Sequence, residues 1–186
     1  MLLSDKSTYK WMGYNPTSGF RKKAVKLIGD LFVSHAIKSD LKRILDPPSE
    51  PTIPAFYGLP KVHKPEPVPL RPIVSCIHSV TYNLAKFAAR ILGPLVGRSL
   101  HHVRNTKDFV DKIKGLQLPD TETIISFDVT ALFTSIPVEA ALQAVKYKLL
   151  HDSTLEKRTN LSVKQLVDIV DLCLSTTYFS YGGVFY

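Results

Sequence analysis

An aspartate, Asp128, follows a short apolar run and precedes a segment that carries the start signals of a helix. Residues 123–125 are apolar or β-branched, which is typical of a short buried strand. Ser135 and Pro137 supply a hydroxyl suited to capping a helix and a proline suited to its first turn. A buried carboxylate needs a partner, and a hard cation bound through oxygen is a partner that also does chemistry. The pattern therefore indicates a metal ligand at Asp128, with a turn-capping aspartate as the alternative.

A second group of residues suited to chemistry lies in a proline-rich segment. Residues 47–72 hold nine of the 13 prolines of the chain, which excludes a helix or a central strand there. Apolar pieces at 56–59 and 73–75 flank a basic loop and predict a β-hairpin. Lys61 lies at the long tip of this hairpin and Arg71 on its returning arm. Lysine offers a point charge to phosphate and arginine a matching fork, and a solvated basic loop is the alternative.

The remaining elements follow from the spacing of apolar residues. Helical periodicity predicts helices at about 21–34, 39–45, 80–92, 107–116, 137–150 and 162–174. We expect Ser39 and Thr106 to cap two of these helices, and Gly182-Gly183 to turn a terminal β-hairpin. Residues 1–20 are expected to be irregular and anchored by their aromatic side chains. Helices mixed with hairpins predict an α+β fold.

The charge of the chain indicates a polyanionic partner. Its formal net charge is +8 and its isoelectric point is near 9.5, as in proteins that bind nucleic acid or an anionic membrane surface. Residues 1–118 carry 19 Lys and Arg against 8 Asp and Glu, and residues 119–186 carry 5 against 8. A basic part thus precedes the slightly acidic part that holds Asp128. This distribution suits an enzyme that binds a polyanion with one part and a metal ion with the other, and chance surface composition is the alternative explanation.

Composition also excludes several classes of protein. A hydrophobic fraction of 45% supports a folded core and excludes wholesale disorder. Cys76 and Cys173 are far apart, which indicates neither a zinc site nor a disulfide framework. The sequence has no apolar run that would cross a bilayer and no signal peptide, so we expect an intracellular protein away from membranes, in the nucleus or the cytoplasm.

Three segments, taken together and in this order, resemble the reverse transcriptase of Penelope-like retroelements. The segments are Tyr-Gly-Leu-Pro-Lys-Val-His-Lys-Pro at 57–65, Leu-Arg-Pro-Ile-Val-Ser at 70–75 and Phe-Asp-Val-Thr-Ala-Leu-Phe-Thr-Ser-Ile-Pro at 127–137. The first two resemble the fingers motifs of that family and the third resembles motif A of its palm. Residues 178–186 resemble the start of motif B.

The resemblance implies an incomplete right-hand polymerase, made of the fingers and the first part of the palm. Residues 1–50 would be an N-terminal helical extension, and residues 51–186 an incomplete reverse transcriptase domain with fingers motifs at 55–75 and motif A at 123–137. The implied activity is RNA-directed DNA synthesis, in which deoxynucleotides are added to a primer 3′ end by two-metal phosphoryl transfer. The implied partners are an RNA template, a DNA primer and deoxynucleoside triphosphates.

The resemblance also assigns a metal site. Asp128 would be the first catalytic carboxylate, and the carbonyl of Val129 would be a secondary ligand, in a site for two Mg²⁺ ions. The second aspartate motif of the family, a Tyr-x-Asp-Asp turn, has no counterpart within this sequence. We therefore expect the 186-residue stretch to be inactive as a polymerase on its own.

Nucleotide-binding roles follow from the same resemblance. Lys61 and Arg71 would clamp the triphosphate, and the backbone amides of Ala131 and Leu132 would bind phosphate oxygens. Phe133 would lie under the sugar and exclude a ribose 2′-hydroxyl by steric contact, with a core phenylalanine as the alternative.

Two other functions stay open at this point. One is a non-catalytic nucleic-acid-binding protein derived from such an element, held to phosphates by its basic part. The other is a ligand for an SH3-type domain, because residues 69–72 form a PxxP motif. That second alternative requires residues 55–75 to be a free polyproline helix rather than a folded hairpin.

Overall fold

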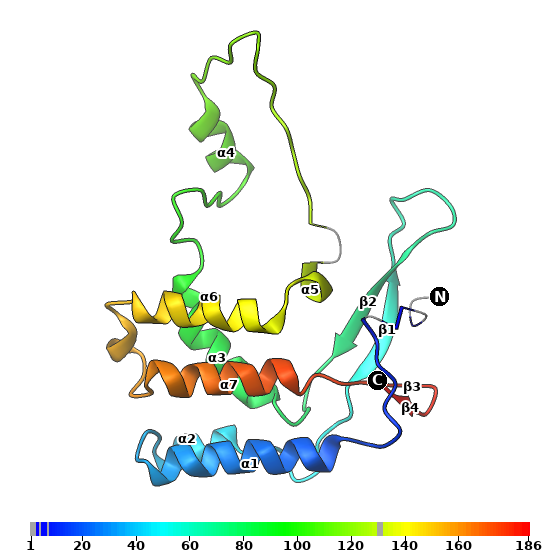
Figure 1. Ribbon diagram of the computed structural model, residues 1–186, viewed down its shortest axis with the longest axis vertical. Coiled ribbons are helices and arrows are strands. Elements are labelled where there is room, and N and C mark those ends of the chain that lie inside the picture. The colour runs from blue at the N-terminus through cyan, green and yellow to red at the C-terminus, as the bar shows by residue number, and fades with distance from the viewer. Residues whose placement is uncertain (1–2, 4, 7, 130–131) are drawn as a thin grey trace.

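The computed structural model describes the chain apart from residues 1–2, 4, 7 and 130–131, and it has a mixed α+β fold. A body of helices carries a small sheet at one end, and a long arm rises from the body (Figure 1). The helices are α1 Thr17–Val33, α2 Ser39–Leu45, α3 Tyr82–Leu92, α4 Thr106–Ile113, α5 Leu132–Ser135, α6 Val138–Leu150 and α7 Val163–Ser175. The strands are β1 Ala55–Pro60, β2 Leu70–Ser75, β3 Ser180–Tyr181 and β4 Val184–Phe185, and the 3₁₀ turns are η2 Gly93–Leu95 and η3 Leu155–Lys157.

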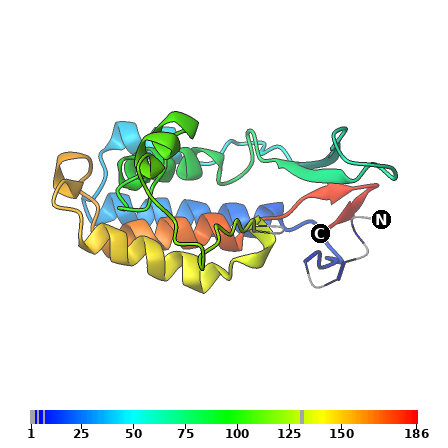
Figure 2. The same cartoon turned by 90° about the horizontal axis from the view of Figure 1, so that it is seen from above.

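The hydrophobic core lies between the helices of the body. Helix α7 packs against α1, α3 and α6, and α2 packs against α1 and α3 (Figures 1 and 2). Apolar residues at helical spacing point inward from these helices, for example Ile28 on α1, Leu84 on α3 and Ile169 on α7, each fully buried. The segment before residue 50 therefore contributes to the same core as the segments after it.

The sheet is built from segments far apart in the sequence. Its strand order is β2-β1-β3-β4, with β1 antiparallel to β2 and parallel to β3. Met12 adds a single bridge to Phe185 beyond β4. Gly182 and Gly183 turn β3 into β4 with φ values of +58° and +80°, as a two-residue hairpin turn requires. This confirms the predicted terminal hairpin.

The predicted helices are found, with corrections at their ends. The helix expected at 21–34 begins earlier, at Thr17. Ser39 and Thr106 are the first residues of their helices rather than the caps. The cap of α4 is Asn105, whose side chain accepts the Asp108 N–H at 2.9 Å.

The expected aromatic anchoring of residues 1–20 is found for Tyr9 and for Phe20, whose ring meets Tyr178 edge-on with centroids 5.4 Å apart. The ring of Tyr9 packs edge-on against Phe56 and Phe179, with centroids 6.1 Å and 5.8 Å away. Trp11 and Tyr14 remain 66% and 67% exposed, so Tyr9, Phe20 and the Met12 bridge anchor this segment.

The arm comprises residues 96–129. Its ascending limb, 96–118, contains α4, and its descending limb, 119–129, is irregular and returns to α5 (Figure 1). The buried strand predicted at 123–125 is wrong. These residues form no strand, and Ile124 and Ile125 are 70% and 68% exposed, because no neighbouring strand or layer lies over them in the described part of the chain.

Among the described residues, no helix combines the length and the apolar character that crossing a membrane demands.

Candidate nucleotide and metal site

Residues 55–75 form a folded hairpin whose strands pair in one register along their whole length. β1 and β2 pair from Ala55↔Ser75 to Pro60↔Leu70, and the Lys61 N–H extends the ladder by donating to the Pro69 carbonyl at 2.9 Å. The prolines fit this ladder. Pro72 faces Gly58 at a position between two hydrogen-bonded pairs, so its nitrogen points away from β1. Because β2 is an edge strand, no other strand lies on that side, and the lack of an N–H costs the ladder no hydrogen bond.

The register brings Lys61 and Arg71 onto one face of the hairpin. Lys61 lies opposite Pro69, and Arg71 lies opposite Leu59, two positions along the strand from Lys61. Because side chains alternate between faces with a period of two, these two cations are diagonal neighbours on the same face. The sequence-predicted pair is therefore a spatial pair.

The opposite face of the hairpin is fixed to the sheet by aromatic packing. Phe56 stacks on Phe179 with centroids 4.8 Å apart and meets Tyr181 edge-on at 5.7 Å. Gly58 lies on the same face as Phe56, and a Cβ there would come within 3.0 Å of the Leu70 side chain. Phe56 and Gly58 thus lie on the face of the sheet that carries the aromatic packing, whereas the half-buried Lys61 and the exposed Arg71 lie on the other face.

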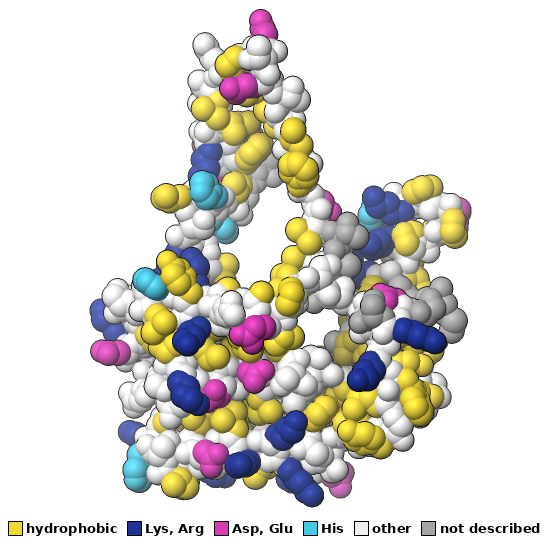
Figure 3. Space-filling model, in the orientation of Figure 1, with side chains coloured by type: hydrophobic (Ala, Val, Ile, Leu, Met, Phe, Trp, Pro, Cys, Tyr) yellow, Lys and Arg dark blue, Asp and Glu magenta, His cyan; other side chains and the backbone are white. Residues whose placement is uncertain are grey.

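The tip of the hairpin is exposed and basic. Lys64 donates its N–H to the Lys61 carbonyl at 2.9 Å, which closes a turn, and His63 and Lys64 are both exposed. Figure 3 shows basic side chains gathered at this tip. An anion that approaches the hairpin on the face with Lys61 and Arg71 therefore meets positive charge from both sides of the hairpin and from its turn.

The folded hairpin rules out the SH3-ligand alternative. Residues 70–72 of the PxxP motif belong to β2 and pair with residues 58–60 of β1. A strand held in an antiparallel ladder is not a free polyproline helix, so the motif is not available in the conformation that such domains bind.

Asp128 lies on a different segment, at the foot of the descending limb of the arm. Asp128 and Val129 are both exposed, and Val129 is 58% exposed. The carboxylate is open to solvent rather than buried at a strand end, so the burial expected from the sequence is wrong. Among the described residues, no group of three or more His, Cys, Asp and Glu side chains is placed to hold a metal ion.

The turn after Asp128 is described only in part. Ala131 lies outside the described residues. Leu132 begins α5 and is 44% exposed, and Phe133 lies on the same short helix, with its side chain outside the described part. Helix α5 itself was not predicted from the sequence, which placed the helix start at Pro137.

Sequence reasoning missed a buried charged cluster beside the arm. The Asp152 side chain, in the loop after α6, has no solvent exposure and forms ion pairs with Arg98 and Arg158. The Thr154 hydroxyl and N–H donate to the same carboxylate at 2.7 Å and 3.0 Å. The hydrogen bonds from Thr154, together with that from Arg158, lower the pKa of Asp152 to about 2. The Asp-x-Thr spacing was the available local signal.

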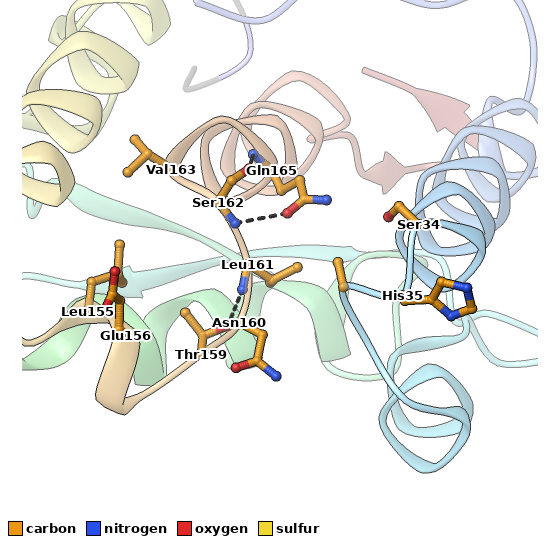
Figure 4. Close-up of a pocket in the computed structure, with 11 residues that line it drawn as sticks. Ser34, His35, Leu155, Glu156, Thr159, Asn160, Leu161, Ser162, Val163 and Gln165 are labelled. Atoms are coloured by element: carbon orange, nitrogen blue, oxygen red, sulfur yellow. Dashed lines mark hydrogen bonds between the residues drawn. The ribbon is translucent and has the colours of Figure 1, made fainter.

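A cavity of about 680 Å³ lies away from the motif residues, between the α1–α2 turn, η3 and the start of α7 (Figure 4). Its lining is mostly polar and includes His35, Glu156 and Asn160. Ser162 and Gln165 on its rim are engaged in the capping box of α7, in which each side chain bonds the backbone of the other residue.

The two cysteines carry free thiols and line a smaller cavity of about 110 Å³ between α3 and α7. Burial raises the pKa of the Cys173 thiol to about 12, so this thiol is protonated and unreactive near neutral pH. The two free thiols agree with the expectation of no disulfide framework.

Comparison of the chain with models of protein families, with curated proteins and with solved structures yields no significant match.

Proposed function

We propose that this chain forms the fingers and the first part of the palm of an RNA-directed DNA polymerase. The observation that carries the proposal is the placement of Lys61 and Arg71 on one face of the β1–β2 hairpin. Two cations with different geometry, held as diagonal neighbours on a rigid ladder, suit the phosphates of a nucleoside triphosphate. The order of the three segments that resemble reverse transcriptase motifs supports the same proposal.

The hairpin is suited to this role because contacts within the sheet hold its strands in place. Its ladder and the stacking of Phe56 on Phe179 hold the strands in place, at a centroid distance of 4.8 Å. Lys61 would supply an ammonium near the tip, and Arg71 would supply a planar guanidinium on the returning strand. Together they would neutralise charge on the triphosphate and orient it.

Asp128 and Val129 would hold Mg²⁺. Magnesium keeps several waters and binds few carboxylates together with substrate phosphates, so an exposed carboxylate fits it. When bound, the metal ions would stabilise the attacking and leaving oxygens of phosphoryl transfer. The contribution of this chain is to present the Asp128 carboxylate at the point where the descending limb meets α5.

Nucleotide binding by this chain tests the first half of the proposal. We expect a fluorescent deoxynucleoside triphosphate to bind, and Lys61→Ala and Arg71→Ala each to weaken binding by about tenfold or more, since each removes a charge-assisted contact. Lys26→Ala, an exposed lysine on α1, is the charge-matched control and should leave binding unchanged. If all three variants weaken binding equally, the triphosphate is attracted by the overall positive charge of the chain and not by a site on the hairpin.

Primer extension by the full-length gene product on an RNA template tests the second half. Asp128→Asn should abolish Mg²⁺-dependent extension and leave RNA binding nearly intact, because the amide keeps the shape of the side chain and loses its charge. If primer extension persists in Asp128→Asn, Asp128 is not a ligand of the catalytic metal ions.

A non-catalytic nucleic-acid-binding role is the second candidate, favoured by the exposed basic tip of the hairpin and the net charge of +8. Such a protein would bind RNA with an affinity that falls steeply with salt and does not respond to Mg²⁺. The polymerase proposal instead expects Mg²⁺ to strengthen triphosphate binding. Titrations in Mg²⁺ and in EDTA at one ionic strength separate the two.

A further inference from the structure

The β1–β2 hairpin projects from the body and joins the rest of the sheet at its base (Figure 1). Strand β1 pairs with β3 through Ala55 and Ser180, and the Ser180 N–H donates to the Pro54 carbonyl at 3.1 Å. Beyond this base, residues 57–60 of β1 pair with β2 alone in the described part of the chain. A two-stranded hairpin is by itself only marginally stable in water, so the contacts at its base set its angle to the body.

Tyr9 lies across the joint between the hairpin and the body. Its ring meets Phe56 of β1 edge-on at 6.1 Å and Phe179, just before β3, edge-on at 5.8 Å. Phe56 stacks on Phe179 at 4.8 Å, so the three rings form one cluster. These centroid distances lie in the range of about 4.5–7 Å that aromatic pairs prefer. The Tyr9 ring therefore contacts the hairpin and the body at the same time.

Backbone hydrogen bonds on both sides of Tyr9 hold its ring in this place. The Tyr9 N–H donates to the Asp5 carbonyl at 2.9 Å, and the Asp5 carboxylate accepts the Thr8 hydroxyl at 2.7 Å. These contacts close a turn directly before Tyr9. Further along, the Met12 N–H donates to the Phe185 carbonyl at 2.8 Å, which ties the segment to the edge of the sheet.

The segment that carries Tyr9 is attached to the body again where α1 begins. The hydroxyls of Thr17 and Tyr178 are 2.7 Å apart and share a hydrogen bond. Tyr178 is buried, and its ring meets Phe20 edge-on at 5.4 Å. The segment is thus fixed to the body at several points, and Tyr9 is the residue through which it reaches the hairpin.

The length of the hairpin makes its tip sensitive to the angle at its base. Lys61 follows Phe56 by five residues, and at about 3.3 Å per residue it lies roughly 17 Å along the strand. A rotation of about 10° at the base would therefore move Lys61 by about 3 Å. A shift of that size exceeds the tolerance of a hydrogen bond to a phosphate oxygen.

We propose that Tyr9 is a positioning residue, which sets the angle of the hairpin to the body and thereby the place of Lys61 and Arg71. The ring acts through Phe56 and touches no substrate. For the nucleotide, the inference rests on the proposed function, in which the hairpin cations and a metal ion at Asp128 bind the same triphosphate. Because Asp128 lies on a separate segment, the triphosphate can reach both sites only if the hairpin keeps a fixed angle.

Residual dipolar couplings of backbone amides measure this angle in the 186-residue chain without any ligand. In the wild type we expect the amides of the hairpin and those of α1 and α7 to fit one alignment tensor. Tyr9→Ala removes the ring from the joint. The hairpin couplings of this variant should no longer fit the tensor of the helices, whether the hairpin takes a new angle or samples several.

Two variants are the controls for Tyr9→Ala. Tyr9→Phe keeps the ring and loses the hydroxyl, so its hairpin couplings should match the wild type. Tyr14→Ala removes the same kind of side chain from the same segment, but Tyr14 is 67% exposed, so the hairpin should stay in place. Tyr9 lies outside the main hydrophobic core, and the couplings of the helices show directly whether the body keeps its fold in each variant.

Primer extension by the full-length gene product measures the consequence for the nucleotide. Tyr9→Ala should raise the KM for deoxynucleoside triphosphate by about fivefold or more, because displaced cations bind the phosphates less well. Tyr9→Phe and Tyr14→Ala should keep a KM near the wild-type value. Since Lys61 and Arg71 are unchanged in all three variants, a raised KM would come from the orientation of the hairpin.

Two results would overturn the proposal. One is a Tyr9→Ala variant whose hairpin couplings still fit the tensor of the helices. The other is a KM that stays unchanged although the hairpin has turned. A wild-type enzyme that extends no primer would contradict the proposed function instead, and the couplings would still decide whether Tyr9 holds the hairpin.

Discussion

Arg98 donates a hydrogen bond of 3.2 Å to the carboxylate of Asp152, and the Asp152 side chain is fully shielded from solvent. Arg98 lies at the base of the ascending limb of the arm, and Asp152 lies in the loop between α6 and η3. The same carboxylate accepts hydrogen bonds from Arg158 and Thr154. This cluster therefore fixes the point at which the arm leaves the body.

Asp152→Asn should lower the stability of the folded chain. The amide keeps the size of the side chain, but it leaves the two guanidinium groups without their counter-charge. Urea unfolding followed by circular dichroism measures the effect. Asp168→Asn is the control, since the Asp168–Lys164 ion pair of 2.7 Å is exposed and its loss should change the free energy of unfolding by at most about 0.5 kcal/mol. Equal effects of the two variants would contradict the role of the cluster.

The stabilising effect of Asp152 should depend on pH in acid. Hydrogen bonds from Thr154, and then from Arg158, lower the pKa of Asp152 to about 2 in the folded state, against about 3.9 in an unfolded chain. A lowered pKa gives stability that is present above the unfolded value and is lost as the pH falls through the folded value. The difference in unfolding free energy between wild type and Asp152→Asn should shrink from about pH 4 to pH 2. A constant difference would contradict the pKa.

Ser162→Ala should destabilise the start of α7 by about 1 kcal/mol. Ser162 accepts the Gln165 N–H at 3.2 Å, and the Gln165 side chain accepts the Ser162 N–H at 2.8 Å, so the substitution removes half of a capping box. Thermal or urea unfolding gives the change. Ser153→Ala, at an exposed loop position, should stay within about 0.5 kcal/mol of wild type.

Arg71→Ala should raise the KM for deoxynucleoside triphosphate by about tenfold or more in primer extension by the full-length gene product. Arg71 shares its hairpin face with Lys61, whereas Leu70 points to the other face. Leu70→Ala therefore serves as the neighbouring control, with KM near the wild-type value. An unchanged KM in Arg71→Ala would show that Arg71 does not bind the triphosphate.

Phe133→Ala should admit ribonucleotides in the same assay. The resemblance to reverse transcriptases places an aromatic wall at this position of α5, and removing it would relieve steric exclusion of the 2′-hydroxyl. The ratio of kcat/KM for deoxynucleotide over ribonucleotide measures the change, and we expect it to fall by about tenfold or more. Unaltered discrimination would leave Phe133 as an ordinary apolar residue.

The helices and hairpins could be predicted because their signals are local. Helix α7 was expected at 162–174 and spans Val163–Ser175, since its apolar spacing is a local signal, and the structure adds that Ser162 is its N-cap. The β1–β2 hairpin followed in the same way from the prolines and the apolar pieces beside them.

The expected strand at 123–125 failed because a strand needs a partner that local sequence does not reveal. A run of apolar, β-branched residues looks the same in the sequence whether or not the fold supplies a neighbouring strand. Here no strand lies against Ile124 in the described part of the chain. The Arg98–Asp152 contact was missed for a related reason. The two residues are far apart in sequence, and only the fold brings them together.

The bridge between Met12 and Phe185 also bears on the order in which the chain folds. The sheet joins the first and the last segments of the chain, since Met12 pairs with Phe185 and Ala55 pairs with Ser180. Contacts of such long sequence separation close slowly, whereas α1, α2 and their turn form from neighbouring residues. During synthesis the hairpin with Lys61 and Arg71 would therefore emerge before its partner strands, and the sheet would be completed only after residues 180–185 have left the ribosome.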